Sequence, residues 1–109
     1  MTDAEKWAKD LEQIPEQERG PLFGLPLSVK ECYNVRDCDS TAGMAYYLNQ
    51  PCEYDCFAVR KLKELGAVPF CLTNVPQTMM SLQCSNPAYG QTSSNSSYLL
   101  VFSKTFFHP

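Results

Sequence analysis

Hydrophobic positions near the N-terminus recur at the spacing of a helix. Trp7, Leu11 and Ile14 follow one another at intervals of four and three residues, which places them on one helical face. This pattern predicts a helix over residues 3–13, and Pro15 ends it because proline interrupts a helix. Such a helix either docks onto a partner or covers one edge of the domain, and its pattern fits both interpretations.

A second pattern has the two-residue period of a strand. Leu25, Leu27 and Val29 alternate with Pro, Ser and Lys, which predicts a short strand over residues 25–30. Residues 33–53 show no such period and contain many turn-forming residues, so we expect an irregular segment there.

A helix and another strand are predicted next. Apolar side chains recur at every third position of residues 54–65, Asp55 is a candidate N-cap, and Gly66 stops the helix. The apolar run over residues 67–72 is typical of a strand buried on both faces of a parallel sheet, although Pro69 disfavours a central position. Strand, helix and strand in this order form a βαβ unit. The predicted fold class is therefore α/β, with one βαβ unit of a mixed sheet and an N-terminal helix.

The remaining residues carry weaker patterns. Residues 73–92 are polar turns with room for one helical turn. Residues 93–97 read Ser-Ser-Asn-Ser-Ser, which is low in complexity, and an apolar run with no clear partner follows over residues 98–102. We therefore expect one partial domain over residues 1–92 and an irregular, unstructured tail over residues 93–109.

Composition and charge narrow the classes of function. The chain has 109 residues, of which 44% are hydrophobic and 19% charged, as is typical of a globular domain. Its net charge of −3 argues against a basic patch that binds nucleic acid. No acidic residue follows Glu64, and Lys104 is the only Lys or Arg after it. Surfaces usually carry both signs of charge, so the stretch from residue 65 onward is expected in an interior, in an interface, or as sequence that was never selected to lie on a surface.

The apolar runs and the first residues bear on location. No stretch approaches the ~20 apolar residues of a membrane span. The first residues are polar and acidic, unlike those of a signal peptide. We therefore expect a cytosolic chain whose thiols are reduced.

Six cysteines leave several kinds of chemistry open. They could form three disulfides, or they could build a redox or metal module. Cys52 and Cys56 are the only pair at the spacing of zinc ligands, no second pair matches them, and the only histidine is His108. This spacing favours free thiols that act as small hydrophobic side chains, so we expect no metal site.

Lys30 and the pair Met79 and Met80 are the candidate functional residues that the patterns offer. Lys30 ends the predicted strand over residues 25–30, and sites in open α/β sheets gather at the carboxyl ends of strands. A lysine in a partly desolvated site can act as a base, whereas a lysine at a strand end also commonly extends into water. Met79 and Met80 either line an apolar ligand channel or fill the core. The sequence contains no nucleophile elbow and no adjacent glycines for a backbone oxyanion hole.

Several segments resemble the amidase signature family in order and spacing. Residues 20–31, Gly-Pro-Leu-Phe-Gly-Leu-Pro-Leu-Ser-Val-Lys-Glu, are similar to the opening motif of that family. Thr-Ala-Gly at residues 41–43 and Thr-Asn-Val-Pro at residues 73–76 follow in family order. Residues 84–92, Cys-Ser-Asn-Pro-Ala-Tyr-Gly-Gln-Thr, resemble the branch that acts on fatty acid amides. The resemblance covers residues 4–92.

This resemblance implies an amide hydrolase that uses a Ser–cis-Ser–Lys triad and no cofactor. The substrate in this branch is a long-chain fatty amide or a related ester. Lys30 matches the base of the triad, which deprotonates the bridging serine. Met79 matches a methionine that contacts the substrate. The resemblance also allows a homo-oligomer in a full-length form, and it implies a location in the cytoplasm or on the cytoplasmic face of internal membranes.

The sequence departs from the family after Thr92. The family continues into a Gly/Ser-rich segment that carries the bridging serine, the oxyanion-hole glycines and the nucleophile, whereas this chain reads Ser-Ser-Asn-Ser-Ser-Tyr. We therefore expect a truncated amidase that keeps Lys30 and does not turn over amides, because loss of triad members removes most of the rate.

The alternative is a non-catalytic binding or regulatory module. Such a module would pair with a full-length amidase or hold an acyl ligand near Met79. Its apolar tail would then act as an interaction strand.

Overall fold

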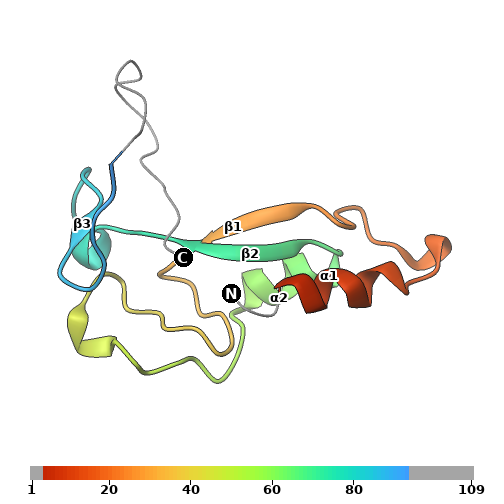
Figure 1. The fold of residues 1–109 in the computed structure, drawn as a ribbon, viewed down its shortest axis with the longest axis horizontal. Coiled ribbons are helices and arrows are strands. Elements are labelled where there is room, and N and C mark those ends of the chain that lie inside the picture. The colour runs from red at the N-terminus through yellow and green to blue at the C-terminus, as the bar shows by residue number, and fades with distance from the viewer. Residues whose placement is uncertain (1–3, 94–109) are drawn as a thin grey trace, which may run out of the picture.

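The computed structural model describes residues 4–93 and has two helices, three short 3-10 turns and two small sheets (Figure 1). The elements in chain order are α1 (Ala4–Glu12), η1 (Glu16–Glu18), β1 (Pro26–Lys30), η2 (Ala45–Tyr47), α2 (Phe57–Glu64), β2 (Val68–Thr73), η3 (Gln77–Met79), β3 (Ser85–Asn86) and β4 (Gly90–Gln91). The mixture confirms the predicted α/β class and its partial character. The predicted tail spans residues 93–109, of which residues 94–109 lie outside the described residues.

The central feature is a parallel pair of strands joined by a helix, as predicted. β1 and β2 pair from Pro26 opposite Val68 to Lys30 opposite Thr73. The register shifts between Leu27 and Ser28, because Leu27 lies opposite Pro69 whereas Ser28 lies opposite Cys71. Proline has no N–H to donate to the ladder, so an irregularity beside it is the expected way to keep it in a strand.

The start of α2 differs from the prediction. The helix begins at Phe57 and its N-cap is Cys56, which makes no side-chain capping hydrogen bond, so the assignment of Asp55 as N-cap was wrong. The Asp55 carboxylate instead accepts hydrogen bonds from the Arg36 backbone amide at 2.8 Å and from Lys63 Nζ at 2.7 Å. The Arg36 amide and the Lys63 ammonium thus bind the carboxylate oxygens of Asp55, which as an N-cap would accept hydrogen bonds from the first turn of α2. The end of the helix was predicted correctly. Gly66 follows the last turn of α2 and has the left-handed φ of a helix stop.

α1 covers an edge of this unit. Leu11 is buried, and Trp7 Nε1 donates a hydrogen bond to the Ala67 carbonyl at 3.0 Å, just before β2. Figure 1 shows α1 and α2 together on one side of the two strands. These contacts favour the interpretation of an edge-covering helix over that of a docking helix.

The core is small and built from valines. Val29, Val35 and Val59 form its centre, one each from β1, the following loop and α2. Leu27, Leu72, Cys38 and Cys56 pack around them. The apolar stripe of α2 and the alternating strand therefore meet as predicted, because both bury one face.

A β3–β4 hairpin was not predicted. Ser85 pairs with Gln91 and Asn86 with Gly90 in antiparallel fashion. Strands of two residues are too short to show a period, so the prediction of polar turns over residues 73–92 missed them. The one predicted helical turn in that stretch is η3.

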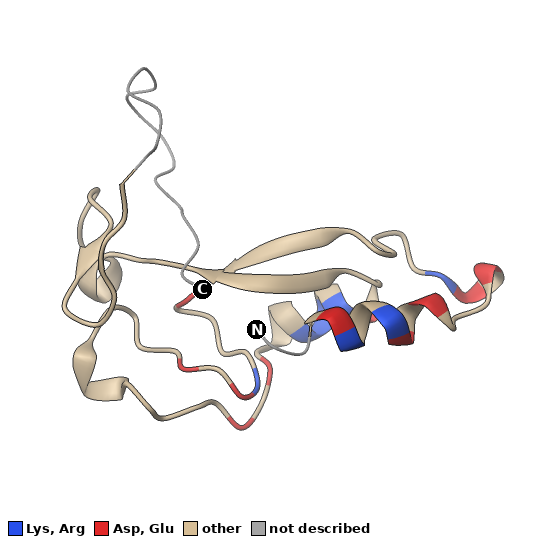
Figure 2. Cartoon of the chain, in the orientation of Figure 1, with Lys and Arg blue, Asp and Glu red and all other residues tan. Residues whose placement is uncertain are grey.

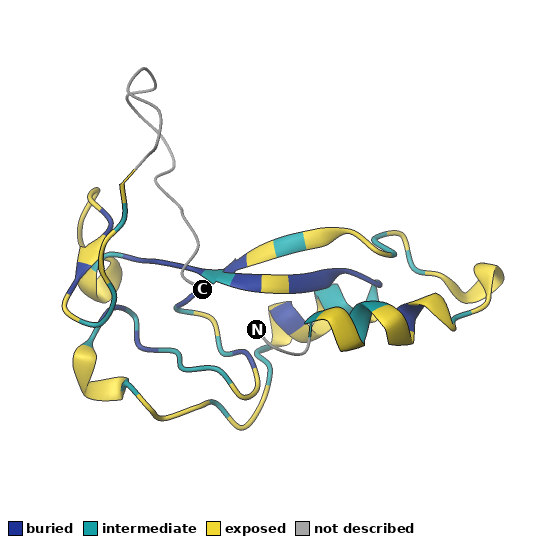
Figure 3. Ribbon diagram, in the orientation of Figure 1, coloured by how far each residue is buried: buried dark blue, intermediate teal, exposed yellow. Residues whose placement is uncertain are grey.

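Charge is unevenly distributed over the fold. Figure 2 shows charged residues on α1, α2 and the loops, whereas the end with β3 and η3 carries none. The expected interior position holds for residues 66–69 and 73–75, which are buried, but residues 77–83 are all exposed (Figure 3). Within the part of the chain that the structure describes, no helix is long and apolar enough to cross a membrane.

Candidate functional site

Lys30 lies at the edge of the sheet where the two parallel strands end. It is the last residue of β1, opposite Thr73 at the end of β2. This confirms its predicted place at the carboxyl end of a strand. The Lys30 side chain is exposed. The three ion pairs within residues 4–93 all involve side chains of α2, and none of them includes Lys30. The structure therefore shows an open, unpaired amine rather than a partly desolvated one.

Glu31 follows Lys30 and is buried, with 4% of its surface exposed. Its Oε1 accepts hydrogen bonds from the Thr41 backbone amide at 2.6 Å and from the Tyr89 hydroxyl at 3.3 Å. Its Oε2 is also buried and has no hydrogen-bond partner among the described residues. A buried polar atom without a partner costs about 1–3 kcal/mol, so Oε2 is an acceptor with room for one more donor.

Tyr89 keeps the protonated hydroxyl that its hydrogen bond to Glu31 requires. Burial raises the pKa of Tyr89, and the negative charge of Glu31 raises it further. The phenol therefore keeps its proton at neutral pH and can donate it to the Glu31 carboxylate.

Two buried asparagines fix the hairpin to the end of β2. Asn74 follows β2 and Asn86 lies in β3, and each is 7% exposed. Asn86 Nδ2 donates to Asn74 Oδ1 and to the Val75 carbonyl, both at 2.6 Å. Asn74 Nδ2 donates to Thr92 Oγ1 at 2.9 Å and to the Gly90 carbonyl at 3.3 Å. Because these buried amides are paired with each other and with the hairpin backbone, the hairpin has one docked position.

Met79 lies in η3, in an unusual backbone conformation. The φ angles of Thr78 and Met79 are 52° and 59°, left-handed values that are uncommon for residues with a side chain. The Thr78 amide donates to the Ala42 carbonyl at 2.8 Å, which ties η3 to the loop before η2. Met79 is 55% exposed and Met80 86% exposed, so the interpretation that they fill the core was wrong. Both residues are instead exposed, so an apolar ligand can reach them.

Lys30 and Met79 belong to the same end of the sheet. Lys30 ends β1, and Met79 follows the end of β2 by a short segment. The strands are parallel, so both segments leave the sheet at one edge. This edge therefore carries an amine and an apolar side chain. The polar contacts of Glu31 and the asparagines fix the segments next to them.

The cysteines add little chemistry to this edge. All six are free, with Cys71 and Cys84 buried and the other four half-buried. Burial raises the pKa of Cys84, and the nearby charge of Lys30 offsets part of that rise. A thiol with a raised pKa is a weak nucleophile at neutral pH. Within residues 4–93, no group of three or more His, Cys, Asp or Glu side chains is arranged to hold a metal ion.

Reasoning from residue patterns missed the buried polar groups of the site. Glu31, Asn74, Asn86 and Tyr89 lie within the motifs that resemble the amidase family, and no residue pattern assigns them a role. A signal for Glu31 was its position two residues after Val29, on the core face of the strand. Nothing in the spacing of the asparagines indicated that they would meet.

Comparisons with known proteins bear on what this edge belongs to. The family described as Amidase matches residues 1–97. Over 95 residues the chain is 43% identical to Fatty acid amide hydrolase 1 of Caenorhabditis elegans, a match that covers 84% of this chain and 17% of that protein. It is 51% identical over 80 residues to Fatty-acid amide hydrolase 1 of Sus scrofa, which covers 73% of this chain and 14% of that protein. It is 42% identical over 83 residues to Vitamin D3 hydroxylase-associated protein of Gallus gallus, which covers 75% of this chain and 18% of that protein.

These matches cover most of this chain and a small part of each relative. The chain spans less than one fifth of the length of the curated relatives it matches. The family match includes both Lys30 and the hairpin that Asn74 and Asn86 hold in place. With a match that extends over residues 1–97, this chain belongs to the amidase family.

Proposed function

We propose that this chain supplies the first part of a catalytic domain that hydrolyses the carbon–nitrogen bond of long-chain fatty amides. Lys30 is the base of a Ser–cis-Ser–Lys triad in this proposal, and Met79 contacts the acyl chain. The observation that carries it is the open amine of Lys30 at the carboxyl edge of a parallel sheet, within a chain similar to two fatty acid amide hydrolases. A lysine acts as a base only where desolvation removes its proton, so this role requires the rest of the catalytic domain to cover the exposed amine.

The proposal assigns no turnover to the 109 residues alone. No Gly-Gly-Ser-Ser sequence occurs in the chain, so no serine is assigned to the triad. The motifs that resemble the family end at Thr92, while the family match itself continues to residue 97, and we assign no role in catalysis to residues 93–109. A lysine without its two serines and an oxyanion hole retains little of the triad's rate.

The test of catalysis is a hydrolysis assay on the purified chain with a long-chain fatty amide. We expect no release of free fatty acid above the buffer control. Release of fatty acid that disappears in the Lys30→Ala variant would overturn the assignment of inactivity and would support the role of Lys30.

The test of substrate class is the binding of a fluorescent long-chain fatty amide to the same chain. We expect Met79→Ala to weaken binding by about tenfold, because a buried acyl chain loses the contact of a thioether side chain. Met80→Ala is the matched control, since Met80 is the neighbouring and more exposed methionine. Equal effects of both substitutions, or no binding at all, would count against Met79 as a substrate contact.

A second candidate function is a non-catalytic module that pairs with a full-length amidase. The favouring observation is the number of large apolar side chains on the surface of the described residues, among them Tyr46, Phe57, Met80 and Leu82. Exposed apolar groups of this size are typical of interaction surfaces when they are contiguous. Co-purification with a full-length relative would support this function, and a monodisperse chain without a partner or ligand would argue against it.

A further inference from the structure

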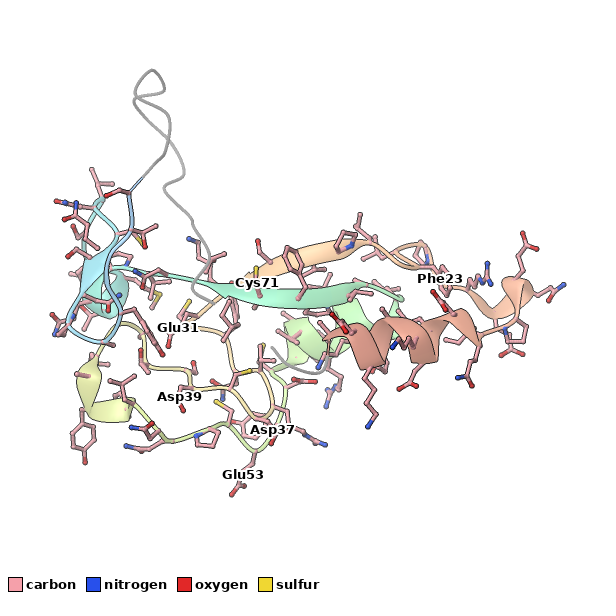
Figure 4. All side chains as sticks on the ribbon, viewed as in Figure 1. Phe23, Glu31, Asp37, Asp39, Glu53 and Cys71 are labelled. Carbon is pink, nitrogen blue, oxygen red and sulfur yellow. The ribbon has the colours of Figure 1, made fainter. Side chains whose placement is uncertain are left out.

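The buried carboxylate of Glu31 joins three separate segments at the edge that carries Lys30. Glu31 itself continues β1, because its amide donates to the Thr73 carbonyl at 3.0 Å. Oε1 then holds Thr41 of the long loop and Tyr89 of the hairpin, 10 and 58 residues away in the sequence. In Figure 4, Glu31 lies between the end of the sheet and the loop that carries Asp37, Asp39 and Glu53. A single side chain therefore binds the strand end, the loop and the hairpin together.

The same side chain also sets the direction of Lys30. Successive residues of a strand point to opposite faces, so a buried Glu31 places Lys30 on the open face. The exposure pattern agrees, since Val29 and Glu31 are buried and Lys30 between them is exposed. The Lys30 carbonyl accepts a hydrogen bond from the Tyr33 amide at 3.0 Å, which closes a turn directly after the strand. Glu31 lies within this turn, so loss of its side-chain contacts removes one anchor of the strand end.

The contacts of Tyr89 reinforce this arrangement. Its backbone amide donates to Asn86 Oδ1 at 2.7 Å, and Asn86 is in turn bonded to Asn74 at the end of β2. The Glu31 side chain is thus connected to the end of β2 through Tyr89 and the asparagines, in addition to the direct bond from the Glu31 amide to Thr73. Only Oε1 of the Glu31 carboxylate takes part in this network. Oε2 is buried and has no hydrogen-bond partner among the described residues.

We propose that Glu31 is the positioning residue of this edge: its carboxylate clamps the Thr41 loop and Tyr89 onto the end of β1 and so holds Lys30 on the open face, while Oε2 accepts one donor from outside residues 4–93. The role given to Lys30 rests on the proposed function. The clamp itself rests on the contacts of Glu31 alone.

The test is amide hydrogen exchange, measured by NMR on the 109-residue chain. Glu31→Ala should speed exchange at the Thr41 and Tyr33 amides by about tenfold or more, because both report on the clamped strand end. The Val68 amide, bonded to the Leu25 carbonyl at the other end of the sheet, should keep its rate. Glu53→Gln is the matched control, since Glu53 is an exposed glutamate of the same loop region and should change neither rate.

A conservative variant separates the clamp from general stability. Glu31→Gln keeps an acceptor for Thr41 and should restore most of the protection at that amide. It removes the negative charge, so the pKa of the Tyr89 phenol should fall toward its ordinary value, while burial and the Asp39 charge keep it raised. Ultraviolet absorbance titration detects this change, and Tyr89→Phe identifies the transition that belongs to Tyr89.

Three outcomes would overturn the clamp. The first is a Thr41 exchange rate in Glu31→Ala within about twofold of the unmodified chain. The second is equal acceleration at Thr41 and Val68, which would make Glu31 a general stabiliser. The third is an unchanged pKa of the Tyr89 phenol in Glu31→Gln. This outcome can be measured even if Glu31→Ala fails to fold. No readout involves turnover, so a failure to bind fatty amide would sink the proposed function and leave the clamp standing.

Discussion

At the scale of single residues, Gly66 shows how closely the end of α2 approaches the segment before β1. Its φ is +92°, and a Cβ at this position would lie 2.8 Å from Phe23 Cα. A side chain there would meet both a strained backbone and a neighbouring main chain that cannot move aside cheaply. Gly66 is therefore required both by the helix stop and by the close approach of the segment before β1.

We expect Gly66→Ala to lower the free energy of unfolding by about 2–4 kcal/mol, measured by urea denaturation. Gly24→Ala is the matched control, because Gly24 has a φ of +72° but no atom within 4 Å of an added Cβ. It should lose only about 1 kcal/mol, the cost of the positive φ alone. Equal losses would show that the contact with Phe23 is unimportant.

Asp55 gives the chain a pH dependence at the residue scale. Burial raises its pKa, but the hydrogen bonds from Lys63 and the Arg36 amide, with the charges of those residues, outweigh it and leave the pKa below its ordinary value. A carboxylate with a lowered folded pKa stabilises the fold above its unfolded pKa of about 3.9 and loses this as the pH falls through the folded value. Both side chains of the Asp55–Lys63 pair are less than a third exposed, at 17% and 25%.

Asp55→Asn should therefore cost about 1 kcal/mol at pH 7, and the difference from the unmodified chain should shrink as the pH falls below about 4. Thermal unfolding at several pH values measures both quantities. Glu64→Gln, which removes an exposed partner of Lys61, is the control and should produce no measurable change. A difference that grows toward low pH would contradict the sign of the Asp55 effect.

At the scale of elements, the hairpin depends on a few buried polar contacts and not on its own strands. β3 and β4 have two residues each, too few for independent stability. Asn86 supplies the donors that bind Asn74 and the Val75 carbonyl. Loss of its amide would leave buried acceptors unpaired and release the hairpin.

Asn86→Ala should lower the free energy of unfolding by about 3 kcal/mol, since buried acceptors each cost about 1–3 kcal/mol when unpaired. Proteolysis should then begin within the hairpin, which mass spectrometry of the fragments would show. Ser85→Ala, on the exposed neighbouring residue of β3, is the control and should cost less than about 0.5 kcal/mol. Unchanged proteolysis in Asn86→Ala would mean that other contacts hold the hairpin.

At the scale of the whole molecule, the balance of buried and exposed apolar groups is unusual. The buried hydrophobic residues contain one leucine and otherwise only Val, Ala and Cys. The large apolar side chains are outside, where ten Leu, Met, Phe and Tyr residues of the described part are exposed. Small buried side chains contribute little to stability, so the described core is weak for a chain of 109 residues.

We expect the isolated chain to bind a hydrophobic dye and to unfold at a low midpoint temperature. Val59→Ala should lower this midpoint further, because Val59 is 1% exposed at the centre of the core and its loss leaves a cavity. Phe57→Ala on the same helix is the control, since Phe57 is 70% exposed. Differential scanning calorimetry measures the midpoint, and a transition above about 60 °C without dye binding would contradict this expectation.

Much of the fold was predictable because its signals are local. The period of Trp7 and Leu11, the alternation that ends at Lys30, and the glycine stop after α2 each act over a few residues. The errors came where distant groups competed with local ones. Asp55 has the chemistry of an N-cap but is taken by Lys63 and Arg36, and the hairpin exists because Asn74 reaches residues far along the chain.

The candidate site divides in the same way. The sequence by itself determined that Lys30 ends a strand, that Met79 follows the next one, and that both belong to motifs of the amidase family. Only the tertiary structure decided that Lys30 is open, that Met79 is exposed, and that Glu31 is buried among three segments. The reason is range: periodicity and turn chemistry act between neighbours, whereas burial and hydrogen bonding of Glu31 depend on residues that meet only when the chain has folded.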